Sequence, residues 1–279
     1  GSMKMISINT NYGGLYAAKA AKSSQALVDT AMERLSTGKR INYAKDDAAG
    51  QAIAVRLTAE IQGLAMASRN AADGQSLLDT AEGALQETTS LLLRMRELAV
   101  QSSNGTLSTS DRTALQTEAA ALETEISRVA NTTTWGGLNL LDGSQSAGIT
   151  FQAGPDAAET ITVSIPEMTA TAATISYSVA LSIGSFTGAQ SAITAIDAAL
   201  SGVNEVRGNL GAASNRLDST IGNLNQIRVN LMASKGRIED ADFATETGNL
   251  AKGQILQQAA TAMLAQANAS KQSVLALLQ

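Results

Sequence analysis

The chain has 279 residues, 44% hydrophobic and only 3% aromatic content, and a formal net charge of -5. It contains no histidine and no cysteine, which removes the commonest general base, the commonest zinc ligand and the thiolate nucleophile. We therefore expect no enzyme activity, no cofactor and no metal site. The modest acidic charge, without a basic cluster, also argues against nucleic acid as a partner.

Two stretches bear on membranes and export. The first residues, Met3 to Asn9, contain no continuous apolar core, so we expect no Sec-type signal and export by another route. The segment 253–270 has no charged residue but carries several side-chain amides. Amides of this kind argue against a membrane span and favour a bundle helix.

The first predicted element is an amphipathic segment before Ala44, with an apolar side formed by Leu27, Val28, Ala31 and Leu35. Asp46 and Asp47 follow it. A pair of aspartates just before an alanine-rich helical run is better explained as an N-cap with a favourable N-terminal charge than as a catalytic dyad.

A ladder of apolar residues with a step of seven predicts a long helix after this point. Its rungs are Leu57, Leu64, Ala71, Leu78, Leu85, Leu92 and Ala99. Glycines at 63, 74 and 83 interrupt the ladder, and each costs about 1 kcal/mol relative to alanine in a helix. They are either tolerated irregularities or places where a neighbouring helix or subunit approaches closely.

Asn104-Gly105 ends this helix, and a second, shorter helix is predicted to run to about Ala130. Beyond Trp135 the apolar period changes to alternation, which predicts β structure. The segments 149–151 and 161–165 flank a turn at Gly154-Pro155-Asp156, and 175–179 forms a third predicted strand. We expect a small β hairpin or sheet, within about 143-188, that caps one end of the helices.

A second ladder with the same step follows, with rungs Ile196, Val203, Leu210, Leu217, Leu224, Leu231 and Ile238. Because the chain must return from the central insert, the two ladders should be antiparallel. The final segment carries Leu256, Met263 and Leu275 on one side.

These elements predict a mainly α fold, a long antiparallel helical bundle or coiled coil with a small central β-hairpin region. We expect two domains: terminal helical arms made of 3-44 plus 240-279, and a bundle of 45-239. The proposed packing residues are the ladder leucines and three residues of the C-terminal arm: Leu57, Leu64, Leu78, Leu85, Leu92, Leu210, Leu217, Leu224, Leu231, Leu256, Met263 and Leu275.

Seven stretches toward the two ends of the chain form recognisable motifs: 33–42, 44–50, 67–71, 80–85, 96–101, 237–243 and 254–259. Together they closely resemble bacterial flagellin, and they occur in the order of that family. Since only about 50 residues separate the helical regions, the chain looks like a minimal flagellin without the large variable outer domains of many members.

The resemblance implies a secreted structural subunit that polymerises into the flagellar filament for motility after export by the flagellar type III route. Head-to-tail contacts that do not close generate an open helical homopolymer. The family also implies an export chaperone on the C-terminal arm, hook-associated junction and cap proteins as partners, and a possible innate immune receptor surface at Arg94, Leu98 and Glu118.

Three alternatives remain open at this stage. A hook-filament junction protein shares related helical ends but caps or connects instead of polymerising indefinitely. A metallopeptidase insert is disfavoured by the absence of histidine. A surface adhesin would use its central β segment to bind a glycan or a host receptor.

Overall fold

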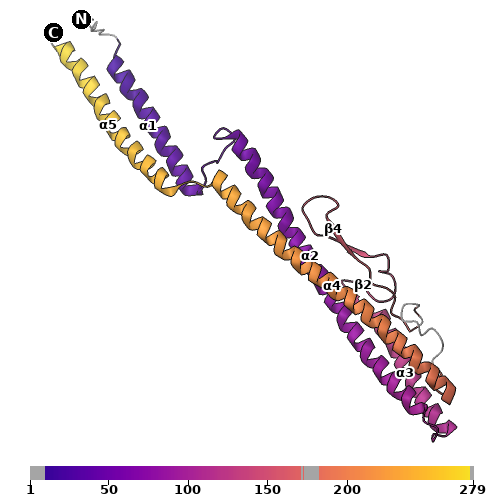
Figure 1. Cartoon of the computed structure of the whole chain (residues 1–279). Helices are drawn as coiled ribbons and strands as arrows, with labels where there is room; N and C mark the ends of the chain where they lie inside the picture. The colour runs from indigo at the N-terminus through magenta and orange to yellow at the C-terminus, as the bar shows by residue number, and fades with distance from the viewer. Residues whose placement is uncertain (1–9, 171, 173–181, 277–279) are drawn as a thin grey trace. The chain divides into compact units, whose positions relative to one another are not determined.

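The computed structural model describes residues 10–170, 172 and 182–276, the last six of these by their backbone alone (Figure 1). Five helices dominate it: α1 (Tyr12–Thr37), α2 (Ala48–Ser102), α3 (Thr109–Thr132), α4 (Phe186–Glu239) and α5 (Phe243–Ala276). Two small antiparallel sheets lie between α3 and α4 in the sequence. The mainly α fold with a small central β region is thereby confirmed.

The chain divides into two compact units. Unit 1 consists of residues 1–59 and 230–279, and unit 2 of residues 60–229. The division into arms of 3-44 plus 240-279 and a bundle of 45-239 stays a prediction. We describe each unit separately.

In unit 2, α2 and α4 run antiparallel, as their cross-links show. Gln75 Nε2 donates to the Ser214 carbonyl at 3.4 Å, Arg207 Nε donates to Glu82 at 2.8 Å, and Arg96 Nε donates to Asp197 at 2.6 Å. As the α2 number rises, the α4 partner number falls, which confirms the predicted direction of the two ladders.

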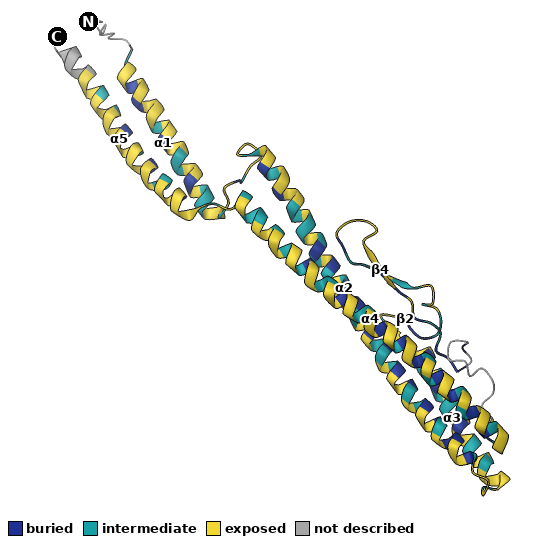
Figure 2. Cartoon of the chain, viewed as in Figure 1, coloured by how far each residue is buried: buried dark blue, intermediate teal, exposed yellow. Residues whose placement is uncertain are grey.

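The core of unit 2 is aliphatic and continuous. Figure 2 shows buried residues where α2, α3 and α4 lie together. The predicted shorter helix is α3, which begins at a capping box made by Ser108 and Asp111 and buries Ile126 and Ala130. The largest fully buried side chains of the described residues come from α2, α3 and the β region: Leu77, Leu78, Leu85, Leu92, Met95, Leu98, Ile126, Leu140, Leu141, Ile165 and Met168.

The predicted hairpin is present as β3 (Ile149–Gln152) and β4 (Thr160–Val163), paired from Ile149 opposite Val163 to Gln152 opposite Thr160. A second hairpin joins β1 (Thr134–Trp135) to β2 (Leu138–Asn139). Gly136 and Gly137 form its turn at φ 56° and 86°, values that suit glycine in a two-residue turn. The segment 175–179 lies outside the described residues.

The expectation that the β region caps one end of the helices is wrong. The hairpin lies along the side of α2, where Asn70 Nδ2 donates to the Gln152 carbonyl at 3.2 Å. A Cβ added at Gly63 would lie 2.9 Å from Pro155, and one at Gly74 would lie 3.1 Å from Phe151. Gly63 and Gly74 therefore leave room for the hairpin to pack against α2. A Cβ at the third ladder glycine, Gly83, would meet no atom within 4 Å.

The aspartates before the helices act as caps. Asp47 Oδ1 accepts from the Gly50 N–H at 2.8 Å at the start of α2, and Asp242 Oδ1 accepts from the Ala244 N–H at 2.9 Å at the start of α5. The Thr245 hydroxyl, which donates to Asp242, lowers the pKa of that carboxyl. The predicted capping role of Asp47 is confirmed.

Candidate assembly surface

Helices α1 and α5 of unit 1 form an antiparallel pair. Asn11 Nδ2 donates to Asn268 Oδ1 at 3.3 Å, Gln257 Nε2 donates to Gln25 Oε1 at 2.6 Å, and Arg34 Nη1 lies 2.8 Å from Glu246 Oε1. The partner numbers fall along α5 as they rise along α1. We call α1 and α5 together the arm pair.

The interface inside the arm pair is lined by small residues. Among the described side chains, those buried there include Ala17, Ser24, Ala31 and Ala260. At Gly253 an added Cβ would lie 2.7 Å from Val28 Cγ2. The two helices approach closely because these positions carry little or no side chain, so the pair buries little apolar volume of its own.

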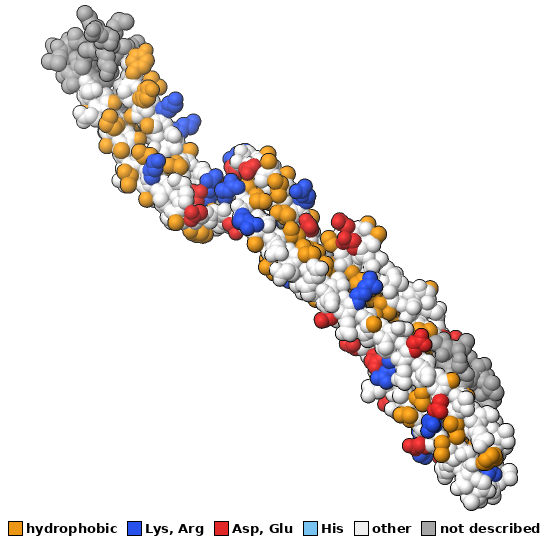
Figure 3. Space-filling model, viewed as in Figure 1, with side chains coloured by type: hydrophobic (Ala, Val, Ile, Leu, Met, Phe, Trp, Pro, Cys, Tyr) orange, Lys and Arg blue, Asp and Glu red, His pale blue; other side chains and the backbone are white. Residues whose placement is uncertain are grey.

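Large apolar side chains of the arm pair face outward instead. Tyr16 is 80% exposed and Met263 is 64% exposed, and the space-filling view shows apolar side chains along this part of the chain (Figure 3). An open apolar groove of about 420 Å³ runs over the pair. It is lined by Gly13, Tyr16, Ala17, Ala20, Ser24, Leu256, Ala259, Ala260 and Met263.

A polar clasp joins the base of the two arms. We use this name for residues 38–40 and 238–241 together with Arg34 and Glu246. Two backbone hydrogen bonds tie the linkers together: the Arg40 N–H donates to the Glu239 carbonyl at 2.6 Å, and the Ala241 N–H donates to the Gly38 carbonyl at 2.9 Å.

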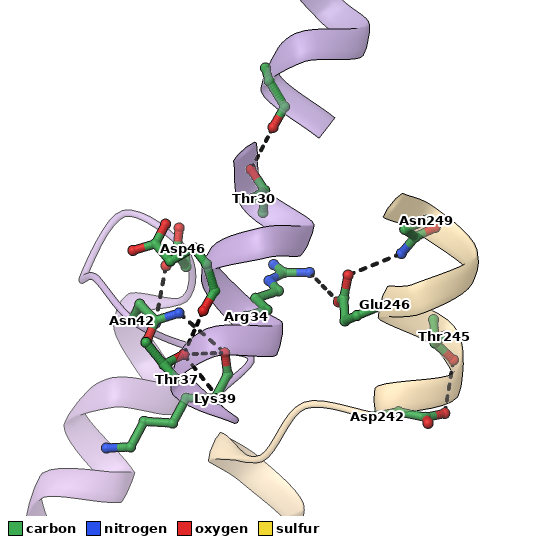
Figure 4. Close-up of polar contacts among 12 residues, drawn as sticks. Thr30, Arg34, Thr37, Lys39, Asn42, Asp46, Asp242, Thr245, Glu246 and Asn249 are labelled. Atoms are coloured by element: carbon green, nitrogen blue, oxygen red, sulfur yellow. Dashed lines mark hydrogen bonds and ion pairs between the residues drawn. The ribbon is translucent and has the colours of Figure 1, made fainter. Parts of the chain in front are cut away.

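Side chains complete the clasp, and Figure 4 shows one of their contacts, from Arg34 to Glu246. Lys39 Nζ lies 2.5 Å from Glu239, and Arg40 Nη2 donates to the Ile238 carbonyl at 2.7 Å. Lys39 and then Lys235 lower the pKa of the Glu239 carboxyl, because each cation favours its charged form. The Glu246 side chain is only 8% exposed, and it also accepts from Asn249 at 3.2 Å.

Most of the predicted packing residues lie in the interior of unit 2. The buried rungs are Leu64, Leu78, Leu85, Leu92, Leu210, Leu217 and Leu224. In this structure they stabilise the chain's own bundle, and none of them forms a surface that a neighbouring copy could contact directly.

The remaining packing residues belong to unit 1. Leu57 and Leu231 are half-buried, whereas Leu256 is 43% exposed and Met263 lies beside it on the groove. The side chain of Leu275 lies outside the described residues. Leu256 and Met263 are thus the predicted packing residues that the structure places on an open apolar face.

The three residues predicted for receptor recognition separate into two environments. Arg94 Nη2 lies 2.7 Å from Glu118 on the surface, and this carboxylate raises the pKa of Arg94. Leu98, in contrast, is 1% exposed. A side chain with that burial belongs to the core, so its assignment to a recognition surface is wrong for this structure.

Sequence reasoning assigned no role to the clasp or to the exposed aromatics Tyr12 and Tyr16. The signal for the clasp was available, since the motifs 33–42 and 237–243 contain most of its residues. What was missing was their contact, because about 200 residues of chain separate the two motifs.

Within the described residues, histidine, cysteine and carboxylate side chains do not gather in groups of three or more that could hold a metal ion. Nor does any described helix have the length and hydropathy needed to cross a membrane.

Comparison with known proteins agrees with this geometry. A family model described as the bacterial flagellin N-terminal helical region matches residues 8–146, and one described as the bacterial flagellin C-terminal helical region matches residues 193–278. A flagellin of Halalkalibacterium halodurans is 47% identical over 249 residues, which cover 89% of this chain and 91% of that protein. Flagellin FlaB1 of Treponema pallidum is 39% identical over 284 residues, covering 98% and 99%.

Solved structures show the same likeness. The crystal structure of Bacillus cereus flagellin matches with a TM-score of 0.50 and 30% identity, covering 56% of this chain and 88% of that one. A putative flagellar hook-associated protein from Vibrio parahaemolyticus matches with a TM-score of 0.59 at 18% identity, covering 70% and 100%. At that identity the second match shows a shared fold only.

Proposed function

The chain belongs to the bacterial flagellin family and is a structural subunit of the extracellular flagellar filament that serves motility, and we propose that its arm pair makes the decisive subunit contacts. The family is structural, in keeping with the expectation of no enzyme activity. The observation that carries the proposal is the inverted arm pair, with small residues inside and large apolar residues outside.

An inverted pair of this kind is unfavourable for an isolated subunit. Exposed apolar surface gains about 25 cal/mol per Å² when it is removed from water, and contiguous apolar surface on a soluble chain marks an interaction site. Copies of the same arm pair supply a matching apolar surface. Contacts of this type between non-equivalent faces produce an open helical polymer.

The test uses Met263, which lines the apolar groove. Met263→Glu places a charge in the proposed contact and should raise the concentration needed for seeded polymerisation about tenfold or more. Met263→Leu keeps the apolar character and serves as the matched control, with polymerisation close to that of the parent. Sedimentation and electron microscopy of seeded samples measure the outcome.

Since Met263 is largely exposed in the single chain, circular dichroism should show the same helix content in all three proteins. If Met263→Glu polymerises at the parent's concentration, the groove is not a subunit contact and the proposal is wrong.

Further partners follow from the same exposed face. Before assembly, the apolar side chains of α5, among them Leu256 and Met263, offer an export chaperone a surface to cover during passage by the flagellar type III route. At the filament ends, the same arm surfaces would contact hook-associated junction and cap proteins.

A host innate immune receptor is a separate proposed partner. On this structure its contact would centre on the exposed ion pair of Arg94 and Glu118 and exclude the buried Leu98. Loss of receptor activation by Arg94→Ala, with activation retained by Leu98→Met, would support this surface.

A further inference from the structure

We propose that the clasp is the nucleus from which the arms pair, so that α1 and α5 zip together from their base toward the chain ends. This inference rests on the proposed assembly role of the arm pair. It concerns the order in which the arm contacts form, which neither the family membership nor the exposed apolar face specifies.

The density of directed contacts is highest at the clasp. Within a few residues it combines two backbone hydrogen bonds, the Lys39 to Glu239 ion pair and the Arg40 side-chain bond to a carbonyl. Hydrogen bonds with an ionised partner are shorter and stronger than neutral ones. Gly38 at φ 70° turns the chain out of α1 and into this arrangement.

The Arg34 to Glu246 ion pair joins the two helices near the linkers, at 2.8 Å. Glu246 is buried although it carries a charge. A buried carboxylate is tolerated when it is paired and hydrogen-bonded, and leaving it without its partner is strongly unfavourable. This pair therefore sets the register of α1 against α5 at their base (Figure 4).

Farther from the clasp the contacts become weaker and less specific. The Gln257 to Gln25 hydrogen bond and the Asn11 to Asn268 hydrogen bond both join exposed amides. Between them lie small side chains such as Ala17 and Ala260. Surfaces of this kind hold two helices together once they are aligned, but they specify little about alignment.

Chain connectivity makes the base the least costly place to start. Helices α2 and α4 pair within unit 2 and lead through short linkers into α1 and α5, so closing the clasp joins ends that are already close along the chain path. Loop closure costs more entropy as the loop lengthens. If pairing started at the arm tips, it would have to close a longer loop. Pairing that extends from the clasp adds one helical turn at a time and closes no further loop.

Pulsed hydrogen exchange of the full-length chain, early in seeded elongation, tests the direction of pairing. We expect amides in residues 31–40 and 239–249 to exchange more slowly than amides in residues 12–22 and 258–268. Faster exchange at the base than at the tips, or equal exchange at both, would overturn the inference.

Seeded elongation tests the consequence for assembly. Arg34→Gln and Glu246→Gln should each remove the protection at the base and slow elongation about tenfold or more. Arg34→Gln leaves the buried Glu246 carboxylate without its cation, and Glu246→Gln removes the ion pair that joins the two helices. The matched control is Gln25→Ala, which removes the mid-arm hydrogen bond and should elongate within about twofold of the parent.

The controls separate this inference from the assembly proposal. If the parent chain does not elongate on seeds, the assembly role of the arm pair fails. If the parent elongates, and both clasp variants elongate at its rate with the base still protected, only the nucleus is wrong. Trp135 fluorescence of each full-length variant verifies that the bundle of unit 2 is intact.

Discussion

The arm pair and the bundle of unit 2 are both made of long antiparallel helices, yet they bury opposite kinds of side chain. The bundle encloses large aliphatic residues such as Leu85 and Leu92, whereas the arm pair encloses alanine, serine and glycine. In the arm pair the large side chains, such as Tyr16 and Met263, face outward.

The difference shows how one chain can hold a self-sufficient part and a part that depends on its neighbours. Burial of a leucine contributes about 1.5–3 kcal/mol relative to leaving it exposed, so the bundle carries its own stabilising core. A helix pair with a small-residue interior gains little in this way. Its outward apolar face gains the corresponding free energy when other copies cover it.

The strongest test of the comparison places the same substitution in both parts. Leu85→Ala removes a fully buried side chain from the bundle and should lower the free energy of unfolding by about 3 kcal/mol, from the lost transfer energy and the cavity. Leu256→Ala on the exposed arm face should change it by less than about 1 kcal/mol. Urea unfolding followed by fluorescence of Trp135, the single tryptophan, measures both.

Seeded polymerisation should rank the two variants the other way at temperatures where both are folded. Leu256→Ala is expected to impair polymerisation more than Leu85→Ala does. Equal loss of bundle stability in the two variants would contradict the division into a self-sufficient and a dependent part.

Glycine substitutions should change the stability of the bundle by a smaller amount, and they show where the hairpin packs closely against α2. Gly63→Ala forces Pro155 of the hairpin away from α2 and should destabilise the bundle by about 1–2 kcal/mol, since the contact of 2.9 Å leaves no room for a methyl group. Gly83→Ala is the matched control on the same helix. With open space around it, it should stabilise by up to about 1 kcal/mol.

The corresponding change in the arms is Gly253→Ala, which presses on Val28. It should lower arm protection in hydrogen exchange and slow polymerisation, and leave the Trp135 unfolding midpoint unchanged. A shift of that midpoint equal to the one caused by Gly63→Ala would show that the two units do not respond separately.

The smallest expected effect is the pH response of the clasp. Lys39 lowers the pKa of Glu239 in the folded state, so the charged carboxylate stabilises the clasp by about 1 kcal/mol or less. This stabilisation is fully present above the ordinary glutamate pKa of about 4.3. It is lost as the pH falls through the lowered pKa. Acid should therefore loosen the clasp, and Glu239→Gln should lack this component.

The Arg40 amide reports on this titration, because it donates to the Glu239 carbonyl. Its NMR chemical shift should change with a midpoint below the ordinary glutamate value in the parent, and the change should be absent in Glu239→Gln. A midpoint at or above the ordinary value would contradict the assigned role of Lys39.

Much of the fold was predictable because it depends on local periodicity. The step of seven identified α2 and α4, the Asn104-Gly105 break separated α2 from α3, and alternation around Gly154 identified the β3–β4 hairpin. The candidate assembly surface was harder to predict from the sequence. Leu256 and Met263 were predicted as packing residues, but the same reasoning placed the core leucines in that set and Leu98 on the surface.

The apolar period of this chain by itself determined which segments become helices, and the need to return from the central insert determined that the ladders run antiparallel. Period alone does not say what covers an apolar stripe, since a stripe buried in its own chain and one awaiting a neighbour have the same spacing. Only the tertiary structure decided that most ladder leucines of unit 2 face inward, whereas arm residues such as Tyr16 and Met263 face outward. It also decided that the hairpin lies along α2 at Gly63 and Gly74, and that two motifs distant in sequence meet as the clasp.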